Sequence, residues 1–310
     1  MRQIAQKTIL STADVARLFS VTETTVKRWA DEGTLKCQKT PGGHRKFEIR
    51  NVVDFAEKNN FEPVGALAFA TGDRLAQRIQ VAMLGRDFSE LVAAFVETAL
   101  SPERMDLFML LSYLYQHRVQ MWEMHDLVIR PGMAEIGERW IRGEIGVNHE
   151  HRASYETLDA LAKLQAQIHV RESTGRCVVC TCMNDELHEI GLRCASYLFE
   201  SEGWMTTYLG ARMPDDAIAS AVHEMKPDVL CLSVTSPSAD GLLEKALGEI
   251  VTLARDVNTK VILGGRLAPA LRIQPGMVEA IPASSRELLD FIEGFDRNYG
   301  RSPEKHDRHR

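Results

Sequence analysis

The chain has 310 residues, of which 45% are hydrophobic and 26% charged, and its formal net charge is −6 at pH 7. This is the composition of an ordinary globular protein, and the length suits two or three domains. No uncharged run approaches the roughly 18 residues that cross a bilayer, and the N-terminus lacks the features of a signal peptide, so we expect a cytoplasmic protein with no membrane partner.

The charge is unevenly distributed along the chain. Residues 1–60 carry a net charge of +4 and the remainder carries −10, which indicates an anionic partner for the N-terminal part alone. The six cysteines have neither zinc-ribbon spacing nor the framework of a secreted protein, so we expect free thiols in a reducing compartment rather than a metal cluster.

Residues 11–33 predict two short helices joined by a turn. Thr22 is a suitable N-cap for the second helix, which turns Val26 and Trp29 inward. Hydroxyl and basic side chains on the opposite face suit the base edges and phosphates of a major groove. The candidate DNA-binding residues of this helix are Thr24, Thr25, Lys27 and Arg28.

A basic hairpin follows. Pro41-Gly42-Gly43 forms the predicted turn, and the candidate DNA contacts His44, Arg45 and Lys46 come directly after it. A solvated charge run is the alternative, but helix-turn-helix and hairpin in this order favour DNA. Residues 8–60 resemble the MerR-type winged-helix family, whose wing has a sequence close to "TPGGHRKF". We therefore expect a winged helix-turn-helix domain at 1–60.

A linker is predicted at 61–73 and a helical domain at 74–172. Apolar residues recur there at helical spacing, with breaks at Gly85, Ser101-Pro102 and Pro131-Gly132, which suits a bundle of four or five helices. Trp140, Glu150 and His151 stand out near the end of this domain. Taken alone, they are as easily explained as a core cap and surface side chains.

Short apolar runs alternate with helical segments over 173–296, which predicts a doubly wound parallel sheet. The first strand is "RCVVCTCM", and the last strand and helix are expected within "MVEAIPASSRELLDFIEGF". Residues 297–310 are expected to be a disordered tail. The fold class is thus multidomain α and α/β: winged helix-turn-helix, helical bundle and Rossmann-like or flavodoxin-like sheet domain.

Ligands of doubly wound sheets bind at the carboxyl ends of the strands. Three loops follow strands at this edge of the predicted sheet. They contain Glu186-x-His188-x-x-Gly191, Ser233-x-Thr235 and Gly264-Gly265. A surface histidine in a capping loop is the alternative explanation of the first segment.

These three segments resemble the signature of cobalamin-binding domains: Asp-x-His-x-x-Gly, then Ser-x-Leu or Ser-x-Thr, then Gly-Gly. The resemblance implies that His188 is the lower axial ligand of cobalt, with Glu186 bonded to its other ring nitrogen. It also implies that Ser233 and Thr235 are hydrogen-bond partners, and that small residues leave room for the displaced cofactor tail. Glu186 departs from the usual Asp by one methylene.

The order of the domains resembles the CarH/LitR family, light-responsive transcriptional repressors that use adenosylcobalamin. The resemblance implies operator DNA as partner, a homotetramer, and a bundle that caps the corrin through Trp140, Glu150 and His151. Ile141 stands where light-sensing relatives have a histidine. Water, His149 or His151 would then replace that ligand after photolysis, or the light response is absent.

Two other interpretations compete with a cobalamin-gated regulator. A corrinoid carrier or cobalamin methyltransferase would leave the first 60 residues unexplained. A cofactor-independent regulator of the MerR type would leave the His188 loop unexplained. Purified protein that carries cobalamin is red, which separates the last possibility from the others.

Overall fold

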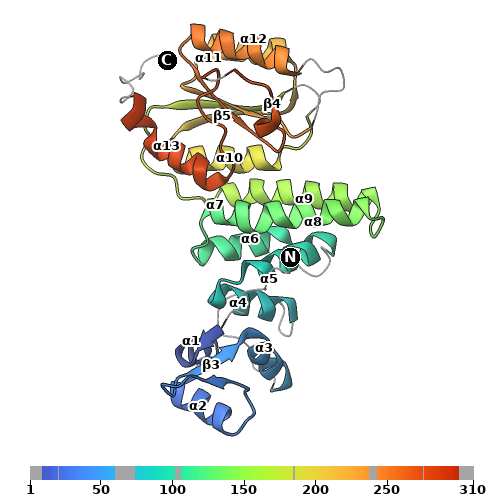
Figure 1. The fold of residues 1–310 in the computed structure, drawn as a ribbon, viewed down its shortest axis with the longest axis vertical. Helices are drawn as coiled ribbons and strands as arrows, with labels where there is room; N and C mark the ends of the chain where they lie inside the picture. The colour runs from blue at the N-terminus through green and yellow to red at the C-terminus, as the bar shows by residue number, and fades with distance from the viewer. Residues whose placement is uncertain are drawn as a thin grey trace. The chain divides into compact units, whose positions relative to one another are not determined.

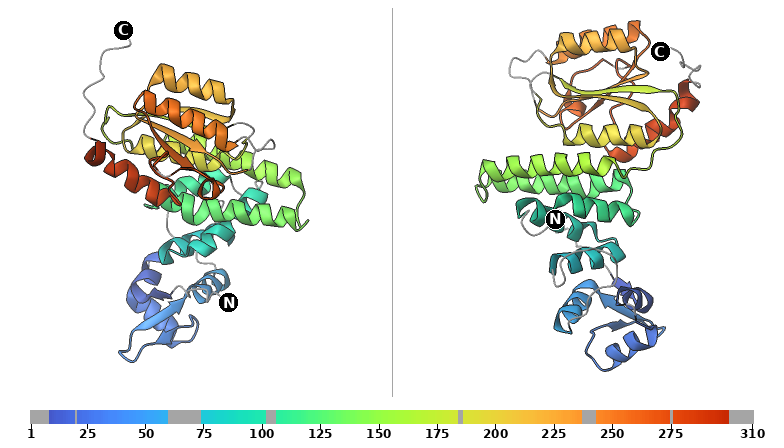
Figure 2. Two further views of the ribbon diagram at one scale, coloured as in Figure 1. Left: turned by 45° about the horizontal axis from the view of Figure 1, so that its top comes forward. Right: turned by 180° about the vertical axis from the view of Figure 1, so that it is seen from behind.

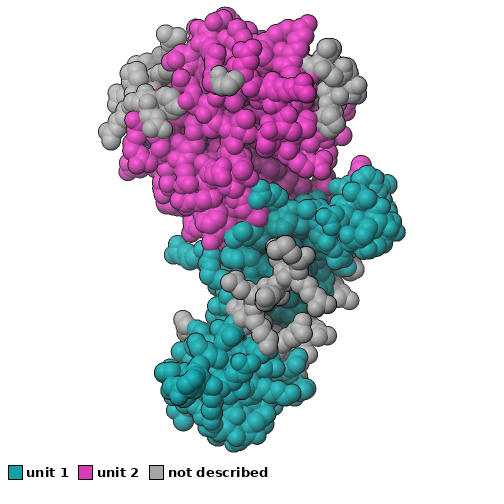
Figure 3. Space-filling view, viewed as in Figure 1, with its two compact units in different colours: residues 1–118, 127–150 teal, residues 119–126, 151–310 magenta. Residues whose placement is uncertain are grey.

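The computed structural model describes residues 9–19, 21–59, 74–101, 106–183, 186–236, 243–274 and 276–299. The chain divides into two compact units, one made of 1–118 with 127–150 and the other of 119–126 with 151–310 (Figure 3). The predicted linker at 61–73 lies outside the described residues.

The N-terminal part of the first unit is a winged helix, as predicted. Its helices are α1 (Thr12–Leu18), α2 (Glu23–Asp31) and α3 (Ile49–Lys58), and its strands are β1 (Ile9–Ser11), β2 (Gln38–Lys39) and β3 (Arg45–Glu48). The strands form an antiparallel sheet in the order β1-β3-β2. The hairpin β2–β3 is the predicted wing, whereas the sequence patterns did not identify β1 or α3.

Local hydrogen bonds begin both helices of the helix-turn-helix. The Ser11 Oγ accepts from the Asp14 amide at 3.2 Å, while Asp14 accepts from the Ser11 amide at 2.9 Å, which is a reciprocal cap. Thr22 caps α2 by accepting from the Thr25 amide at 3.2 Å. The core beneath these helices includes Val26 and Phe47, and Val81 of helix α4 (Arg74–Gly85) packs into it.

The helical segments that follow are α5 (Phe88–Leu100), α6 (Leu107–Gln116), α7 (Met121–Met124), a π-helix (His125–Ile129), α8 (Arg130–Ile141) and α9 (Val147–Gln165). The predicted break at Pro131-Gly132 is wrong, because α7, the π-helix and α8 follow one another without interruption from Met121 to Ile141. A proline ring meets the carbonyl four residues earlier, here that of Leu127, and the wider π turn relieves this conflict.

Gly132 brings α8 close to α5. A Cβ at this position would lie 2.9 Å from Cε1 of the Phe95 ring and closer still to Cδ1. Phe95 is fully buried, so the ring has little freedom to move.

Gly132→Ala is therefore expected to destabilise the protein by about 1–3 kcal/mol, the usual cost of overpacking a core. Gly137→Ala in the same helix is the matched control, since nothing lies within 4 Å of its added Cβ. Urea unfolding monitored by circular dichroism measures both variants. Equal stability of the two variants would contradict this close packing.

The second unit contains the predicted doubly wound sheet. Parallel strands β4 (Cys177–Met183), β5 (Met205–Met213), β6 (Val229–Ser233) and β7 (Lys260–Gly264) lie in the order β5-β4-β6-β7. Helices α10 (Ile190–Ser201) and α13 (Ser285–Tyr299) cover one face, and α11 (Asp215–Met225) and α12 (Leu243–Asp256) cover the other (Figures 1 and 2). The chain turns from β4 outward in both directions, so the loops after β4 and β6 meet at the switch point.

Three details of this unit differ from the sequence-based expectations. The expected last strand is a single parallel bridge between Ile262 and Ala280. Helix α10 begins at Ile190, so Gly191 lies in this helix and not in the predicted loop. Helix α13 continues to Tyr299, into the segment expected to be disordered, and residues 300–310 lie outside the described part of the chain.

None of the described helices combines the length and the apolar character needed to cross a membrane.

Candidate functional site

Glu186 and His188 form a tight pair in the loop after β4. The backbone amide and the ring Nδ1 of His188 both contact Glu186 Oε1, at 2.9 and 2.7 Å. The Glu186 side chain is 4% exposed, whereas that of His188 is 67% exposed. A buried carboxylate thus fixes an imidazole ring that faces solvent.

The other oxygen of Glu186 binds the loop after β6. Glu186 Oε2 accepts from the amides of Thr235 at 2.6 Å and Ser236 at 2.7 Å. The Ser236 hydroxyl also lies 3.4 Å from His188 Nδ1. One carboxylate therefore joins the two loops that meet at the switch point of the sheet.

These contacts determine the charge of Glu186. Burial by itself would raise its pKa, but the hydrogen bonds from His188, Thr235 and Ser236 outweigh burial and lower the pKa below the ordinary value of 4.5. The carboxylate is therefore ionised near neutral pH. Its contribution to stability is fully present above pH 4.5 and is lost as the pH falls through the lowered pKa.

An ionised Glu186 selects the tautomer of His188. The carboxylate is only an acceptor, so Nδ1 carries the proton and donates it to Glu186. The lone pair is then on Nε2, which is the nitrogen available to a metal outside the loop. A carboxylate, a histidine and an external metal in this order are a common arrangement of metalloproteins. The residues present thus fit a cobalt ion bound at His188 Nε2.

The Ser-x-Thr segment also supports the carboxylate of Glu186. Thr235 acts through its backbone amide, which donates to Glu186, and Ser233 is buried at the end of β6. Ser236, which the sequence analysis missed, is the hydroxyl next to the imidazole. The longer side chain of Glu186 explains how one carboxylate contacts both its own loop and this segment.

The two glycines after β7 let the neighbouring loops approach closely. Gly265 has a φ of +96°, and an added Cβ would lie 2.6 Å from the carbonyl carbon of Val234. Only glycine tolerates both this conformation and this contact. Gly264 pairs with Ser233 in the sheet, so the Gly-Gly segment supports the loop that holds Thr235.

A thiol lies beneath the site. The Sγ of Cys182 contacts the carbonyl oxygen of His188 at 3.9 Å. Burial, together with the charges of Glu186 and Glu189, raises the pKa of Cys182 to about 12. The side chain is thus a neutral thiol at ordinary pH and a poor competitor of the imidazole for a metal.

A second polar cluster fixes the start of α10. The Tyr208 hydroxyl donates to Glu189 Oε2 at 2.7 Å, and the guanidinium carbon of Arg193 lies 3.4 Å from the centroid of the Tyr208 ring. Burial and the Glu189 hydrogen bond raise the pKa of Tyr208, which stays protonated. No local sequence pattern indicates this cluster, because it joins β5 to α10 across the fold.

The segment 119–126 packs on the same unit through α7, which contacts α10 and α13. Asp126 caps α13 by accepting from the amides of Ser285 at 3.1 Å and Arg286 at 3.2 Å. The His125 Nδ1 pairs with the Ser285 hydroxyl. A Cβ at Gly191 would lie 3.8 Å from His125 Nε2, so this histidine borders the third residue of the His188 motif.

The predicted cap residues lie at the α8–α9 hairpin. Trp140 is 45% exposed and Ile141 78% exposed at the end of α8. Glu150 and His151 follow one another in the first turns of α9. His149 Nδ1 accepts from the Gly146 amide at 3.3 Å and so caps this helix.

The predicted DNA-binding residues are displayed on α2 and the wing. Thr24, Lys27, Arg28 and His44 are exposed, and Thr25 and Lys46 are half-buried. Arg45 differs from the other basic residues, because its guanidinium binds Asp31. The sequence patterns did not identify Asp31, because they do not show that the end of α2 lies next to the wing.

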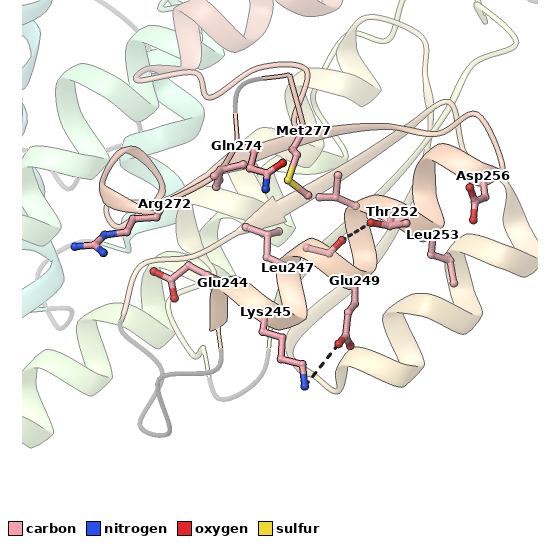
Figure 4. A pocket seen from close by; sticks show the side chains of 13 residues that line it. Glu244, Lys245, Leu247, Glu249, Thr252, Leu253, Asp256, Arg272, Gln274 and Met277 are labelled. Atoms are coloured by element: carbon pink, nitrogen blue, oxygen red, sulfur yellow. Dashed lines mark hydrogen bonds and ion pairs between the residues drawn. The ribbon is translucent and has the colours of Figure 1, made fainter.

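A separate groove lies beside α12 in the second unit (Figure 4). Its volume is about 690 Å³, and Glu244, Arg272 and Met277 are among the residues that line it. The predicted site residues do not contribute to this lining.

Two known protein families match separate parts of the chain. Residues 9–60 match a helix-turn-helix domain and residues 176–283 match a B12 binding domain. These matches lie within the ranges that the sequence analysis expected for the two domains.

One curated relative spans most of the chain. The HTH-type transcriptional repressor CarH of Myxococcus xanthus is 26% identical over 242 residues, which cover 73% of this chain and 79% of the relative. Among solved structures, the monomethylamine corrinoid protein of Methanosarcina barkeri is similar with a TM-score of 0.52 and 13% identity, covering 65% of this chain and 96% of that one. That structure supports the fold alone. The chain thus joins a region that matches a helix-turn-helix domain to a region that matches a B12 binding domain, and over most of its length it is similar to a CarH-type transcriptional repressor.

Proposed function

We propose that this protein is a repressor that binds operator DNA under the control of adenosylcobalamin, held through His188 as the lower axial ligand of cobalt. The observation that carries this proposal is the His188–Glu186 pair. A solvent-facing imidazole with Nδ1 bound by a buried carboxylate is built to present Nε2 to a metal.

Each residue of the site has a defined task in this proposal. Glu186 fixes the ring and its tautomer, and increases the basicity of Nε2. The amides of Thr235 and Ser236 hold the carboxylate in place. Gly191, Ser233, Gly264 and Gly265 leave space at the strand ends for the cofactor tail. The cofactor itself supplies a cobalt–carbon bond that light can break.

We propose that the α8–α9 hairpin covers the upper face of the bound cofactor. Trp140, Glu150 and His151 match the cap motif of the resembling family, and Trp140 is 45% exposed at the end of α8. Closure of this cap would organise a homotetramer in the cytoplasm with several DNA-binding domains. The side chain of Ile141 has no lone pair, so it cannot bind cobalt after illumination. We favour water at that position over His149 or His151.

On the DNA side, we propose that α2 enters the major groove. Thr24, Thr25, Lys27 and Arg28 face the bases and phosphates, and His44, Arg45 and Lys46 belong to the wing beside it. A corrinoid carrier of an enzyme would account for the second unit but gives the winged helix no role, so the regulator is the better explanation.

Loading and light test this function together. We expect protein reconstituted with adenosylcobalamin in the dark to be red, to sediment as a larger species than the apo form, and to return to the smaller species after illumination. The measurement is analytical ultracentrifugation of the three samples with absorption spectra of each. Ile141→His is the informative variant, since a histidine there should produce a bis-imidazole spectrum after illumination. Identical sedimentation of apo and loaded protein would contradict cofactor-controlled assembly.

A further inference from the structure

One arginine of the wing, Arg45, already forms an ion pair within the domain. Arg45, the first residue of β3, directs Nη2 to both carboxylate oxygens of Asp31 at 2.6 and 2.7 Å. Asp31 is the last residue of α2. The ion pair therefore connects the turn end of the wing hairpin to the end of the recognition helix.

Lys39 is the third member of this cluster. Its Nζ lies 3.2 Å from Asp31 Oδ1, and Lys39 faces Arg45 directly in the β2–β3 ladder. Hydrogen bonds from Arg45 and then Lys39 lower the pKa of Asp31. The Asp31 carboxylate is thus ionised near neutral pH.

Arg45 is also less exposed than Lys39, the other basic residue that binds Asp31. Its side chain is 16% exposed, compared with 58% for that of Lys39. Its Nε is buried without a hydrogen-bond partner in the described part of the chain. A side chain enclosed in this way is poorly placed to reach a phosphate.

The wing is otherwise internally rigid. The Thr40 amide donates to the His44 carbonyl at 2.9 Å, and the His44 amide donates to the Thr40 hydroxyl at 3.2 Å. Gln38 donates to Glu48 across the hairpin at 2.9 Å. The contact between Asp31 and Arg45 therefore adds a polar link between this hairpin and α2, beside the core that Phe47 of β3 and Val26 of α2 share.

The basic residues of α2 are in a different situation. Among the described residues, Lys27 pairs with Glu23 of the same helix at 3.7 Å, and Arg28 pairs with Glu32 directly after it at 3.9 Å. Both side chains are about half exposed or more, at 49% and 65%. Such loose pairs separate easily, which leaves these cations for phosphates.

We propose that Asp31 and Arg45 are a positioning pair that sets the wing at a fixed angle to the recognition helix, and that the charge of Arg45 serves this pair instead of a DNA phosphate. The inference rests on the proposed DNA binding. It assigns direct contacts on the wing to His44 and Lys46, and leaves Arg45 to act through Asp31.

A charge reversal tests this assignment. In the double variant Asp31→Arg with Arg45→Asp, the ion pair can form again with its ends exchanged, and the new Asp lies opposite Lys39. A phosphate contact, in contrast, cannot be restored by placing a carboxylate at position 45. The two roles therefore predict opposite results for the double variant.

The experiment uses the full chain loaded with adenosylcobalamin in the dark and measures its affinity, at several salt concentrations, for a duplex that the loaded wild type selects from a random pool. Arg45→Asp alone is expected to weaken binding at least about tenfold, since it breaks the pair and adds a repulsive charge. The double variant is expected to recover to within about threefold of the wild type, with an unchanged slope of log affinity against log salt. Arg28→Ala is the matched control, and its slope is expected to be shallower by about one unit.

A double variant that binds as weakly as Arg45→Asp, with a shallower salt slope, would overturn the proposal and make Arg45 a phosphate ligand. Circular dichroism checks that each variant is folded. If the double variant does not fold, Asp31→Asn replaces it: the amide weakens the ion pair but leaves Arg45 intact, so affinity equal to or tighter than that of the wild type would contradict positioning. A wild type that selects no duplex would instead refute the proposed DNA binding.

Discussion

Replacing His188 with alanine is expected to abolish the retention of cobalamin by the purified protein. The substitution removes the exposed imidazole whose Nε2 is the proposed cobalt ligand, and it leaves only hydrogen bonds and packing to hold the cofactor. Glu186→Gln should have a smaller effect, on the order of tenfold in affinity, as is usual for a partner of a metal ligand. The amide can no longer accept from His188, Thr235 and Ser236 with the strength of a carboxylate.

The measurement is the absorbance of bound cobalamin after gel filtration in the dark. His223→Ala is the matched control, because His223 is an exposed histidine of the same unit on helix α11. We expect this variant to bind cobalamin as the wild type does. Full retention by His188→Ala would sink the assignment of the lower ligand.

Gly265→Ala is expected to destabilise the second unit by on the order of 3 kcal/mol, because it combines an unfavourable φ with a collision against fixed backbone. The added Cβ would lie 2.6 Å from the carbonyl carbon of Val234 and 2.8 Å from its nitrogen. The chain at Val234 leads directly to the amides that hold Glu186. Cobalamin retention should therefore fall together with stability.

Gly276→Ala separates the cost of the unfavourable φ from the cost of the collision with Val234. Gly276 also has a positive φ, +77°, but nothing lies within 4 Å of its added Cβ. Strain alone should cost about 1–2 kcal/mol, and cobalamin retention should stay at the wild-type level. Urea unfolding and gel filtration of both variants provide the comparison. Equal loss of stability in the two variants would show that the approach to Val234 is unimportant.

The sequence predicted the site loop because its chemistry is local. Glu186 and His188 are two residues apart, so their contact follows from one turn of the chain. The partners Thr235 and Ser236 are about fifty residues away, and their contact depends on β6 lying beside β4. Alternating strands and helices predict a parallel sheet, but they do not specify the order of its strands. The amide contacts to Glu186 therefore could not be predicted from the sequence.

The helical region shows a different limit of prediction from the sequence. Proline and glycine at 131 and 132 are ordinary signals of a helix end, and here both are used inside a continuous helical segment. The π turn accommodates Pro131, and the Phe95 ring explains Gly132. Tertiary packing outweighed local propensity at both positions. Neither the π turn nor the contact with Phe95 has a signature in the local sequence.

The wing shows that residue type alone does not assign a role. His44, Arg45 and Lys46 form one basic run, and the sequence pattern predicts the same role, a DNA contact, for all three. The structure separates Arg45 from the others, because the end of α2 brings Asp31 within hydrogen-bonding distance. This distinction depends on the angle between the helix and the hairpin, which the linear pattern does not contain.

The most direct test of the account measures DNA affinity with and without the cofactor, in the wild type and in His188→Ala. The probe is the duplex selected from a random pool by the wild type loaded with adenosylcobalamin in the dark. We predict that loading strengthens wild-type binding at least about tenfold, as for coupled sites, and that the same addition leaves His188→Ala unchanged. Equal affinity of apo and loaded wild type, or the same gain in His188→Ala, would contradict control of DNA binding through a His188-bound cobalamin.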